Sequence, residues 1–302
     1  MTAMNTTTEE PVTPVTINPF VDWGFKYVFG REETKDLLIG FLNLLLKPEV
    51  PFTDITYLNP EVIPERKDMK RCVFDVLCRD AEGERYLIEM QKAWRQDMSS
   101  RLVYYLCRLI DRMGRHSEKW EYGMIKRVYG ICLMDFTYEE HPQLRHDILL
   151  RNQDGSTYSD LLNIITLQIP CIQTKSLADC KESYEILLNL LNLTSKKMKT
   201  KEELLKEIDA LEHVCEDTKE MFRRMVMTMN HGLTPIQLSE YMAEVDEYEA
   251  TFGLEASARL RGLREGRKER SHEIARAMKE KGIDPQIIAD CTGLSESEII
   301  AL

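Results

Sequence analysis

Residues 71–91, RCVFDVLCRDAEGERYLIEMQ, predict a β-hairpin, and this hairpin decides the class of fold. Two runs of alternating residues meet at the short loop Ala81-Glu82-Gly83. A three-residue loop of this kind needs one residue in the left-handed conformation, and Gly83 is well placed for it. The stretch therefore predicts two antiparallel strands joined by a tight turn.

The pairing of the hairpin follows from symmetry about Glu82. Such a ladder pairs Arg79 with Arg85, Leu77 with Leu87, Asp75 with Glu89, and Val73 with Gln91. Because side chains alternate along a strand, one face is wholly apolar and holds Phe74, Val76, Cys78, Tyr86, Ile88 and Met90. The other face holds two carboxylates directly opposite one another, with Cβ atoms roughly 5 Å apart.

Two carboxylates at this spacing need compensation. Two like charges about 5 Å apart repel by roughly 3 kcal/mol at an effective dielectric constant near 20. A proton would remove the repulsion, and so would a hard divalent cation bound by the two carboxylates, water and a substrate phosphate oxygen. The alternative is an exposed edge hairpin whose acids are solvated.

Composition indicates a soluble globular protein. The 302 residues provide for one large domain or one domain with appendages, and the net charge of −11 argues against a general nucleic-acid binder but not against local basic groups. No apolar run is long enough to span a bilayer, so no membrane partner is expected. The eight cysteines form no closely spaced pair, which is typical of buried, reduced thiols in a cytoplasmic protein and does not favour zinc.

The order of helical and strand patterns predicts a mixed α/β core. Residues 18–30 have a partly helical aromatic spacing, and the strongest helical patterns cover 34–46, 96–119 and 183–193, with further helices up to Phe252. Strand patterns cover 55–63, 128–136, 147–150 and 164–169, and the second of these is apolar enough for a strand covered on both faces. A lysine-rich linker spans 195–201.

The C-terminal region has a basic part and an acidic part. Residues 256–281 contain nine Lys or Arg and four Glu, whereas residues 284–302 contain four acids and neither Lys nor Arg. Asp284-Pro285 predicts a helix start, and Ser295 with Glu298 predicts a capping box, so the segment resembles a helix-turn-helix. Its lack of basic groups favours a packing or partner-binding module over a DNA reader, and makes the preceding basic segment the better candidate for backbone contact.

The predicted organisation has four parts. Residues 1–15 form a disordered tail, 16–194 the α/β domain, 195–255 a helical region, and 256–302 the basic helix with the helix-turn-helix-like segment.

The central hairpin and its surroundings resemble a PD-(D/E)XK nuclease core. A strand, tight turn and strand carry an Asp that faces a Glu-x-Gln, and a helix with arginines follows. More specifically, the chain resembles the family of PD-(D/E)XK transposases, or recombination-promoting nucleases. The matching residues are Asp22, Phe25-Lys26, Phe29-Gly30, Lys67-Asp68, Phe74-Asp75-Val76, Gly83, Ile88-Glu89-Met90-Gln91, Arg101, Tyr104-Tyr105, Ile131, Met134-Asp135-Phe136 and the tail from Gly282 to Ile299.

This resemblance implies a fold and a metal site. The fold is a restriction-endonuclease-like mixed sheet flanked by helices, with α-helical additions at the C-terminus. Asp75 and Glu89 would bind Mg²⁺ (or Mn²⁺), with the Met90 carbonyl as a third ligand. Asp22 would be an accessory acid, and Lys26, one helical turn further on, would pair with Asp22 or contact phosphate. A surface ion pair between Asp22 and Lys26 is the alternative.

Gln91 departs from the wider nuclease pattern, which has Lys at this position. An amide orients a water or contacts the scissile phosphate, but it supplies no charge and is no general base. The resembled family itself has Glu-x-Gln, so Gln91 agrees with the family. Lys92 does not replace the lysine, because the next residue points to the opposite face.

The resemblance implies an Mg²⁺-dependent DNA endonuclease. Arg101 and Arg108 on the 96–119 helix would contact DNA, unless they belong to a solvated helix face. The alternative function is a nuclease-fold protein with little or no turnover that binds DNA or a partner. The sequence does not determine the oligomeric state and leaves a homodimer open.

Overall fold

The computed structural model describes residues 13–62, 72–93, 95–113, 121–137, 142–174 and 176–292, together with 294 and 299. Residues 1–12 of the predicted tail lie outside the described residues, and so do Lys67, Asp68, Gly293, Ser295 and Glu298 with the predictions that rest on them. The chain forms two compact units that divide between Asp246 and Glu247.

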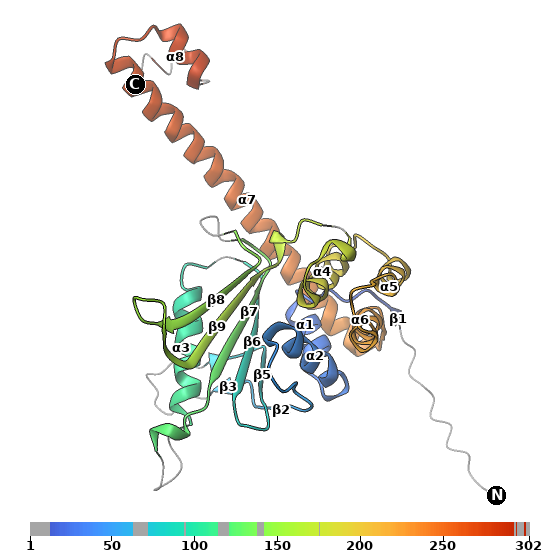
Figure 1. Cartoon of the computed structure of the whole chain (residues 1–302). Helices are drawn as coiled ribbons and strands as arrows, with labels where there is room; N and C mark the ends of the chain where they lie inside the picture. The colour runs from blue at the N-terminus through green and yellow to red at the C-terminus, as the bar shows by residue number, and fades with distance from the viewer. Residues whose placement is uncertain are drawn as a thin grey trace, which may run out of the picture. The chain divides into compact units, whose positions relative to one another are not determined.

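A six-stranded mixed sheet lies at the centre of the first unit (Figure 1). Its order is β2-β5-β6-β7-β9-β8. The strands are β2 (Thr56–Tyr57), β5 (Val76–Arg79), β6 (Arg85–Gln91), β7 (Val128–Met134), β9 (Thr157–Gln168) and β8 (Arg145–Arg151). Strands β6, β7 and β9 run parallel, whereas β2, β5 and β8 are antiparallel to their neighbours. The carboxyl ends of the three parallel strands therefore share one edge of the sheet.

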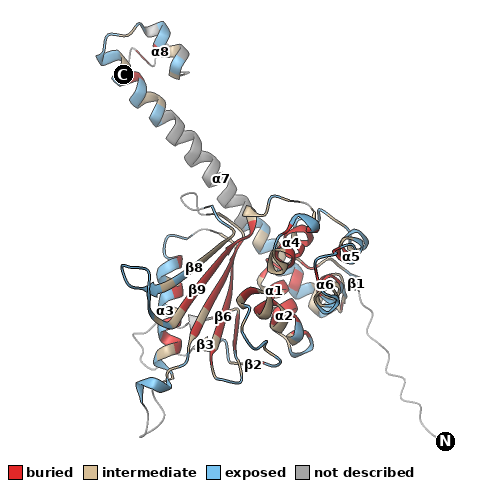
Figure 2. Ribbon diagram, in the orientation of Figure 1, coloured by how far each residue is buried: buried red, intermediate tan, exposed pale blue. Residues whose placement is uncertain are grey.

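Helices cover both faces of this sheet. On one face lie α1 (Asp22–Phe29), α2 (Lys35–Leu46), α4 (Ser183–Ser195), α5 (Lys201–Asp209) and α6 (Glu216–Met229). On the other face lies α3 (Met98–Asp111). Within β7, Ile131 and Leu133 join the first core, while Cys132 and Met134 join the second. Figure 2 shows the central strands of the sheet as buried. Because β7 contributes residues to both cores, the prediction that this strand is covered on both faces is confirmed.

The hairpin has the predicted register along the whole of β5. Val76 pairs with Ile88 and Arg79 with Arg85, and Gly83 has a left-handed φ of 87°. The ladder ends at Val76, however, because the residue before it lies in a bend.

The bend at Asp75 overturns the remaining pairing. The preceding strand β4 (Cys72–Val73) pairs with β3 (Glu61–Val62), so the prediction of a ladder that continues through Asp75 to Val73 is wrong. The bend also breaks the alternation of side chains. Phe74 packs with the core under α3, not on the other face as predicted.

Two predicted elements differ from expectation within the described residues. The strand predicted over 55–63 is split into β2 and β3, and the helix predicted over 96–119 is observed as α3, which ends at Asp111. Residues 63 and 114–119 of these predictions lie outside the described part of the chain. Pro60 lies between the two short strands, where its lack of an N–H interrupts pairing. The remaining short elements are η1 (Glu32–Thr34), η2 (Tyr122–Met124), η3 (Ile169–Cys171), η4 (Leu177–Asp179) and the β1 (Thr13–Pro14) and β10 (Gly232–Leu233) pair.

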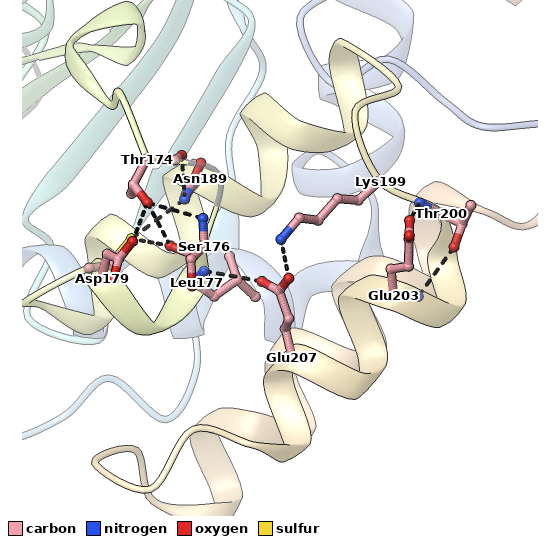
Figure 3. A network of polar contacts seen from close by, with 10 residues as sticks. Thr174, Ser176, Leu177, Asp179, Asn189, Lys199, Thr200, Glu203 and Glu207 are labelled. Atoms are coloured by element: carbon pink, nitrogen blue, oxygen red, sulfur yellow. Dashed lines mark hydrogen bonds and ion pairs between the residues drawn. The ribbon is translucent and has the colours of Figure 1, made fainter.

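The lysine-rich segment between α4 and α5 is fastened to the fold (Figure 3). Glu207 on α5 forms an ion pair with Lys199 and accepts a hydrogen bond from the Leu177 N–H of η4 at 3.1 Å. Thr200 and Glu203 form a reciprocal capping box at the start of α5. This segment is therefore a structured connection between two core helices.

The described cysteines are free thiols, but only some of them are buried. Cys78, Cys132 and Cys180 are buried, as predicted. Cys107, Cys215 and Cys291 are exposed, so the expectation of burial is wrong for them.

Helix α7 (Pro235–Glu280) is continuous where separate helices were expected. In the first unit its residues Leu238, Tyr241 and Val245 pack with Ile17 and Tyr27. In the second unit Ala275 of α7 and Ile288 of α8 (Pro285–Thr292) form a small core with Leu294 and Ile299. No helix among the described residues is both long and apolar enough to cross a membrane.

Candidate active site

The predicted acidic residues gather at the carboxyl end of β6. Glu89 and Gln91 lie among the last three residues of this strand, and Asp75 lies in the bend that precedes β5. Ligand sites in open α/β sheets commonly form at the carboxyl ends of the parallel strands. The hairpin therefore places these three side chains where a site is expected.

The main-chain groups of Met90 point away from β7. The odd-numbered residues of β6 form the main-chain hydrogen bonds to β7 and its flanking residues, as two bonds show: Arg85 N donates to Arg127 O, and Asp135 N donates to Gln91 O. Main-chain groups of successive residues in a strand point to opposite sides. Those of Met90 are therefore directed to the β5 side.

Asp75 takes over one ladder bond of Met90. The Met90 N–H donates to Oδ2 of Asp75 at 2.6 Å. The Phe74 N–H, which a continued ladder would direct to the Met90 carbonyl, donates to the carbonyl of Pro60 at 3.0 Å. The bend thus fixes the Asp75 carboxylate beside β6 and removes the ladder donor of the Met90 carbonyl.

Glu89 is buried beneath α3 with half of its carboxylate unsatisfied. Its side chain is 6% exposed, and Oε2 lies 3.2 Å from the Gln91 amide nitrogen and 3.9 Å from the Arg101 guanidinium. Oε1 is buried and has no hydrogen-bond partner. A cavity of about 10 Å³ beside the carboxylate is lined by Gln91, Met98, Arg101, Leu102, Tyr105 and Cys132. An unpaired buried carboxylate oxygen is expensive unless a proton or a cation satisfies it.

Asp22 and Lys26 approach from the opposite face of the sheet, on α1. Their side chains form the ion pair that was the alternative interpretation, at 2.8 Å. Burial opposes the charge of Lys26, but the hydrogen bond and charge of Asp22, followed by the charge of Asp75, outweigh it and raise the pKa of Lys26. The pair therefore lies close enough to Asp75 to interact with it electrostatically.

The two central carboxyl groups have raised pKa values. Burial, and then the charge of Asp75, raise the pKa of Glu89 from 4.5 to about 8, against the lowering effect of Arg101. Burial likewise raises the pKa of Asp75 from 3.8 to about 6, with the negative charge of Asp22 adding to it and the Met90 hydrogen bond opposing it. Such paired shifts of neighbouring acids are typical of functional sites.

These groups fit a hard divalent cation. Carboxylate and carbonyl oxygens are the ligands that Mg²⁺ and Mn²⁺ prefer, and a cation would satisfy the orphaned Oε1 of Glu89 while relieving the repulsion from Asp75. Within the described part of the chain, no three His, Cys, Asp or Glu side chains form a ready metal cluster. A metal here would thus be held by two carboxylates, the Met90 carbonyl and water.

The two arginines predicted to contact DNA differ in their surroundings. Arg101 is 30% exposed, lies 3.9 Å from Glu89, and stacks its guanidinium over Tyr105 at 5.6 Å. The side chain of Arg108 is only 7% exposed and pairs with Asp111 at 3.2 Å. Burial argues against a phosphate contact by Arg108, whereas Arg101 lies at the site.

Sequence reasoning missed Glu244 among the residues around the site. It lies on α7, and its Oε2 accepts a hydrogen bond from the Trp23 N–H of α1 at 2.8 Å. The two positions are 221 residues apart, so no local pattern pointed to this contact.

Three features define a protein of the PD-(D/E)XK nuclease class. They are the mixed sheet, the bend with its Asp, and the Glu-x-Gln under an arginine-bearing helix. The family model described as PD-(D/E)XK nuclease family transposase matches residues 19–232, and the chain belongs to this family. A second model, the C-terminal HTH domain of the Rpn/YhgA-like nuclease family, matches residues 268–302. Both matches confirm the family and the fold class predicted from the sequence.

The helix-turn-helix match bears on the C-terminal segment in particular. It supports a DNA contact there, against which the lack of Lys and Arg after residue 283 had argued. No curated protein and no solved structure matches the chain significantly.

Proposed function

We propose that this protein is a divalent-metal-dependent DNA endonuclease that hydrolyses phosphodiester bonds at the carboxyl end of β6. The observation that carries the proposal is the buried carboxylate of Glu89, which has one unsatisfied oxygen and a strongly raised pKa beside Asp75. Membership in a nuclease family supports the same reaction.

A bound Mg²⁺ or Mn²⁺ would polarise the scissile phosphate and lower the pKa of an attacking water. Asp75 and Glu89 would hold the ion, with the Met90 carbonyl as a further ligand. The bend directs Asp75 toward β6, where its Oδ2 accepts a hydrogen bond from the Met90 N–H.

The remaining side chains would position the reactants. The Gln91 amide, which donates to Glu89 at 3.2 Å, would orient a water but would not take its proton. Lys26 and Asp22 form an ion pair and add no net charge. Their contribution would be to place one ammonium group and one carboxylate near the site. Arg101 would contact the DNA phosphate, and its charge lowers the pKa of Glu89 against the stronger effects of burial and Asp75.

A second candidate function is a DNA- or partner-binding protein with weak catalysis. Gln91 favours it, because this site has an amide where most nucleases of this fold have a lysine charge. In that case the helix-turn-helix domain would carry the main activity, and the nuclease fold would serve as a platform.

A plasmid-nicking assay separates the two candidates. We expect the wild-type protein to nick supercoiled DNA with Mg²⁺ or Mn²⁺ and not with EDTA, and the double variant Asp75→Ala/Glu89→Ala to be inactive under both conditions. Equal nicking by the wild type and the double variant would remove the case for this site. DNA binding without nicking by either would favour the second candidate.

The two arginines provide a matched pair for DNA contact. Arg101→Ala is expected to weaken DNA binding and to reduce the slope of log K against log salt by about 1, because one phosphate contact is lost. Arg108→Ala is expected to lower the melting temperature and to leave this slope unchanged, because its charge is buried against Asp111. Binding isotherms across a salt series test both, and a change of slope in the Arg108 variant would contradict the assignment.

A further inference from the structure

The N-terminus of α1 lacks a cap from its own sequence. Val21 is the N-cap residue and has the extended conformation usual there (φ −91°, ψ 141°), but its side chain has no oxygen to accept a hydrogen bond. The first N–H groups of a helix have no partner inside the helix. Asp22, the first helical residue, is the acidic residue whose charge raises the pKa of Asp75.

Helix α7 supplies the missing acceptor. Oε2 of Glu244 accepts a hydrogen bond from the Trp23 N–H at 2.8 Å. A carboxylate at this position also interacts favourably with the positive end of the helix dipole. The cap of α1 therefore comes from a residue far away in the sequence.

The surrounding contacts hold α7 at this helix end. The Tyr241 hydroxyl accepts a hydrogen bond from the Asn18 N–H at 2.7 Å, and the Trp23 indole N–H donates to Glu240 at 3.2 Å. The Trp23 ring stacks on Tyr27 with 4.8 Å between ring centroids and lies 5.5 Å from the Tyr241 ring. Glu244 is thus presented on a packed surface of the first unit.

The position of α1 decides where the Asp22–Lys26 pair lies. Both side chains come from a helix of only eight residues, so the fixation of its first turn strongly affects the whole element. The negative charge of Glu244 is also felt at Lys26, together with the stronger effects of Asp22 and Asp75.

We propose that Glu244 is a positioning residue for the nuclease site: its hydrogen bond to the Trp23 N–H fixes the first turn of α1 and thereby holds Asp22 and Lys26 against Asp75. The inference rests on the proposed function for its effect on catalysis, but not for its effect on the helix. It assigns to α7, the helix that continues into the C-terminal unit, a direct role in the order of the site.

Four full-length variants test the role. Glu244→Ala removes the acceptor, whereas Glu244→Gln keeps an oxygen that can accept the hydrogen bond. Glu240→Ala is the matched control, because it removes the hydrogen bond to the Trp23 indole and leaves the helix end capped. Val21→Thr combined with Glu244→Ala gives α1 a cap of its own, since threonine is a good N-cap residue and is close to valine in shape.

Two measurements are made on each variant. The first is amide hydrogen exchange over residues 18–30 in the metal-free protein. The second is the initial rate of Mg²⁺-dependent nicking together with the Mg²⁺ concentration that gives half of the maximal rate.

We expect Glu244→Ala to accelerate exchange in the first turn of α1. The same variant should slow nicking about tenfold and raise the Mg²⁺ midpoint, because small displacements of catalytic groups strongly reduce the rate. Glu244→Gln and Glu240→Ala should remain within about twofold of the wild type, and Val21→Thr should restore at least part of the loss. Unchanged exchange in Glu244→Ala, or equal losses in Glu244→Gln and Glu244→Ala, would overturn the positioning role. A wild-type protein without any nicking would overturn the proposed function instead, and the exchange measurement would still decide the role of Glu244 in α1.

Discussion

Glu89→Gln is expected to abolish cleavage and, at the same time, to stabilise the metal-free protein. The glutamine keeps the shape of the side chain but cannot supply a negative charge to a metal. If the metal contributes several kcal/mol of charge stabilisation, the nicking rate should fall by roughly 10³-fold or more.

The gain in stability follows from the raised pKa. The folded state binds the Glu89 proton more tightly than the unfolded state, because its pKa rises from 4.5 to about 8, mainly through burial. The contribution of Glu89 to the free energy of unfolding of the metal-free wild type therefore decreases as pH rises from about 4.5 to about 8, and the full penalty is present above that range. Glu89→Gln removes this penalty, which is on the order of 1–3 kcal/mol and corresponds to a few degrees in Tm.

Thermal melting at pH 5.5 and pH 8.5, with and without Mg²⁺, measures these effects. In EDTA at pH 8.5 the variant should melt above the wild type, and the difference should shrink at pH 5.5. Addition of Mg²⁺ should raise the Tm of the wild type and leave that of the variant unchanged, because a ligand stabilises only the state that binds it. Glu49→Gln, which removes an exposed negative charge, is the control and should match the wild type. A variant that melts below the wild type in EDTA at pH 8.5 would show that the ionised Glu89 carboxylate does not destabilise the folded protein.

The two Asp75 variants should lose activity alike but differ from one another in stability. Asp75→Ala and Asp75→Asn should both lose nicking to a similar extent, because each removes one of the two proposed metal-binding charges. Only Asp75→Ala, however, deprives the Met90 N–H of its acceptor, which lies at 2.6 Å in the wild type. A buried donor without a partner costs about 1–3 kcal/mol, so Asp75→Ala should melt a few degrees below Asp75→Asn.

The comparison of the two Asp75 variants in EDTA tests the structural role of this carboxylate. Both remove the same charge, so the difference between them reports the hydrogen bond and not the electrostatic repulsion. Identical melting temperatures would mean that the Met90 N–H finds another acceptor, and that the bend before β5 does not depend on Asp75.

Much of the central sheet was predictable because its information is local. The alternation of apolar residues and the glycine at the turn determine the β5–β6 register, and the long apolar run determines that β7 is covered on both faces. The 3- and 4-residue spacing of apolar side chains likewise predicted α3. The acids Asp75 and Glu89 were found for the same reason, since two carboxylates interrupt an otherwise apolar pattern.

The predictions failed where a distant segment competes for the same backbone. Pairing of β4 with β3 bends the chain at Asp75, and periodicity within the hairpin contains no information about that partner. Arg108 was expected to contact DNA or to belong to a solvated helix face, yet the packing of α3 on the sheet buries it. The resemblance to a nuclease family supplied the role of Asp22, while its contact with the site depends on how α1 packs.

The sequence by itself determined the hairpin, its turn and the presence of the two acids, because these follow from side-chain alternation, residue type and spacing along one stretch of chain. Its resemblance to known proteins indicated the nuclease family. Only the tertiary structure decided that Asp75 binds the Met90 N–H, that one oxygen of Glu89 remains unpaired, and that Glu244 caps the helix of Asp22. Each of these contacts joins segments that approach only when the sheet and its helices pack. The hairpin therefore carries the candidate site, and the fold around it determines how that site is held and charged.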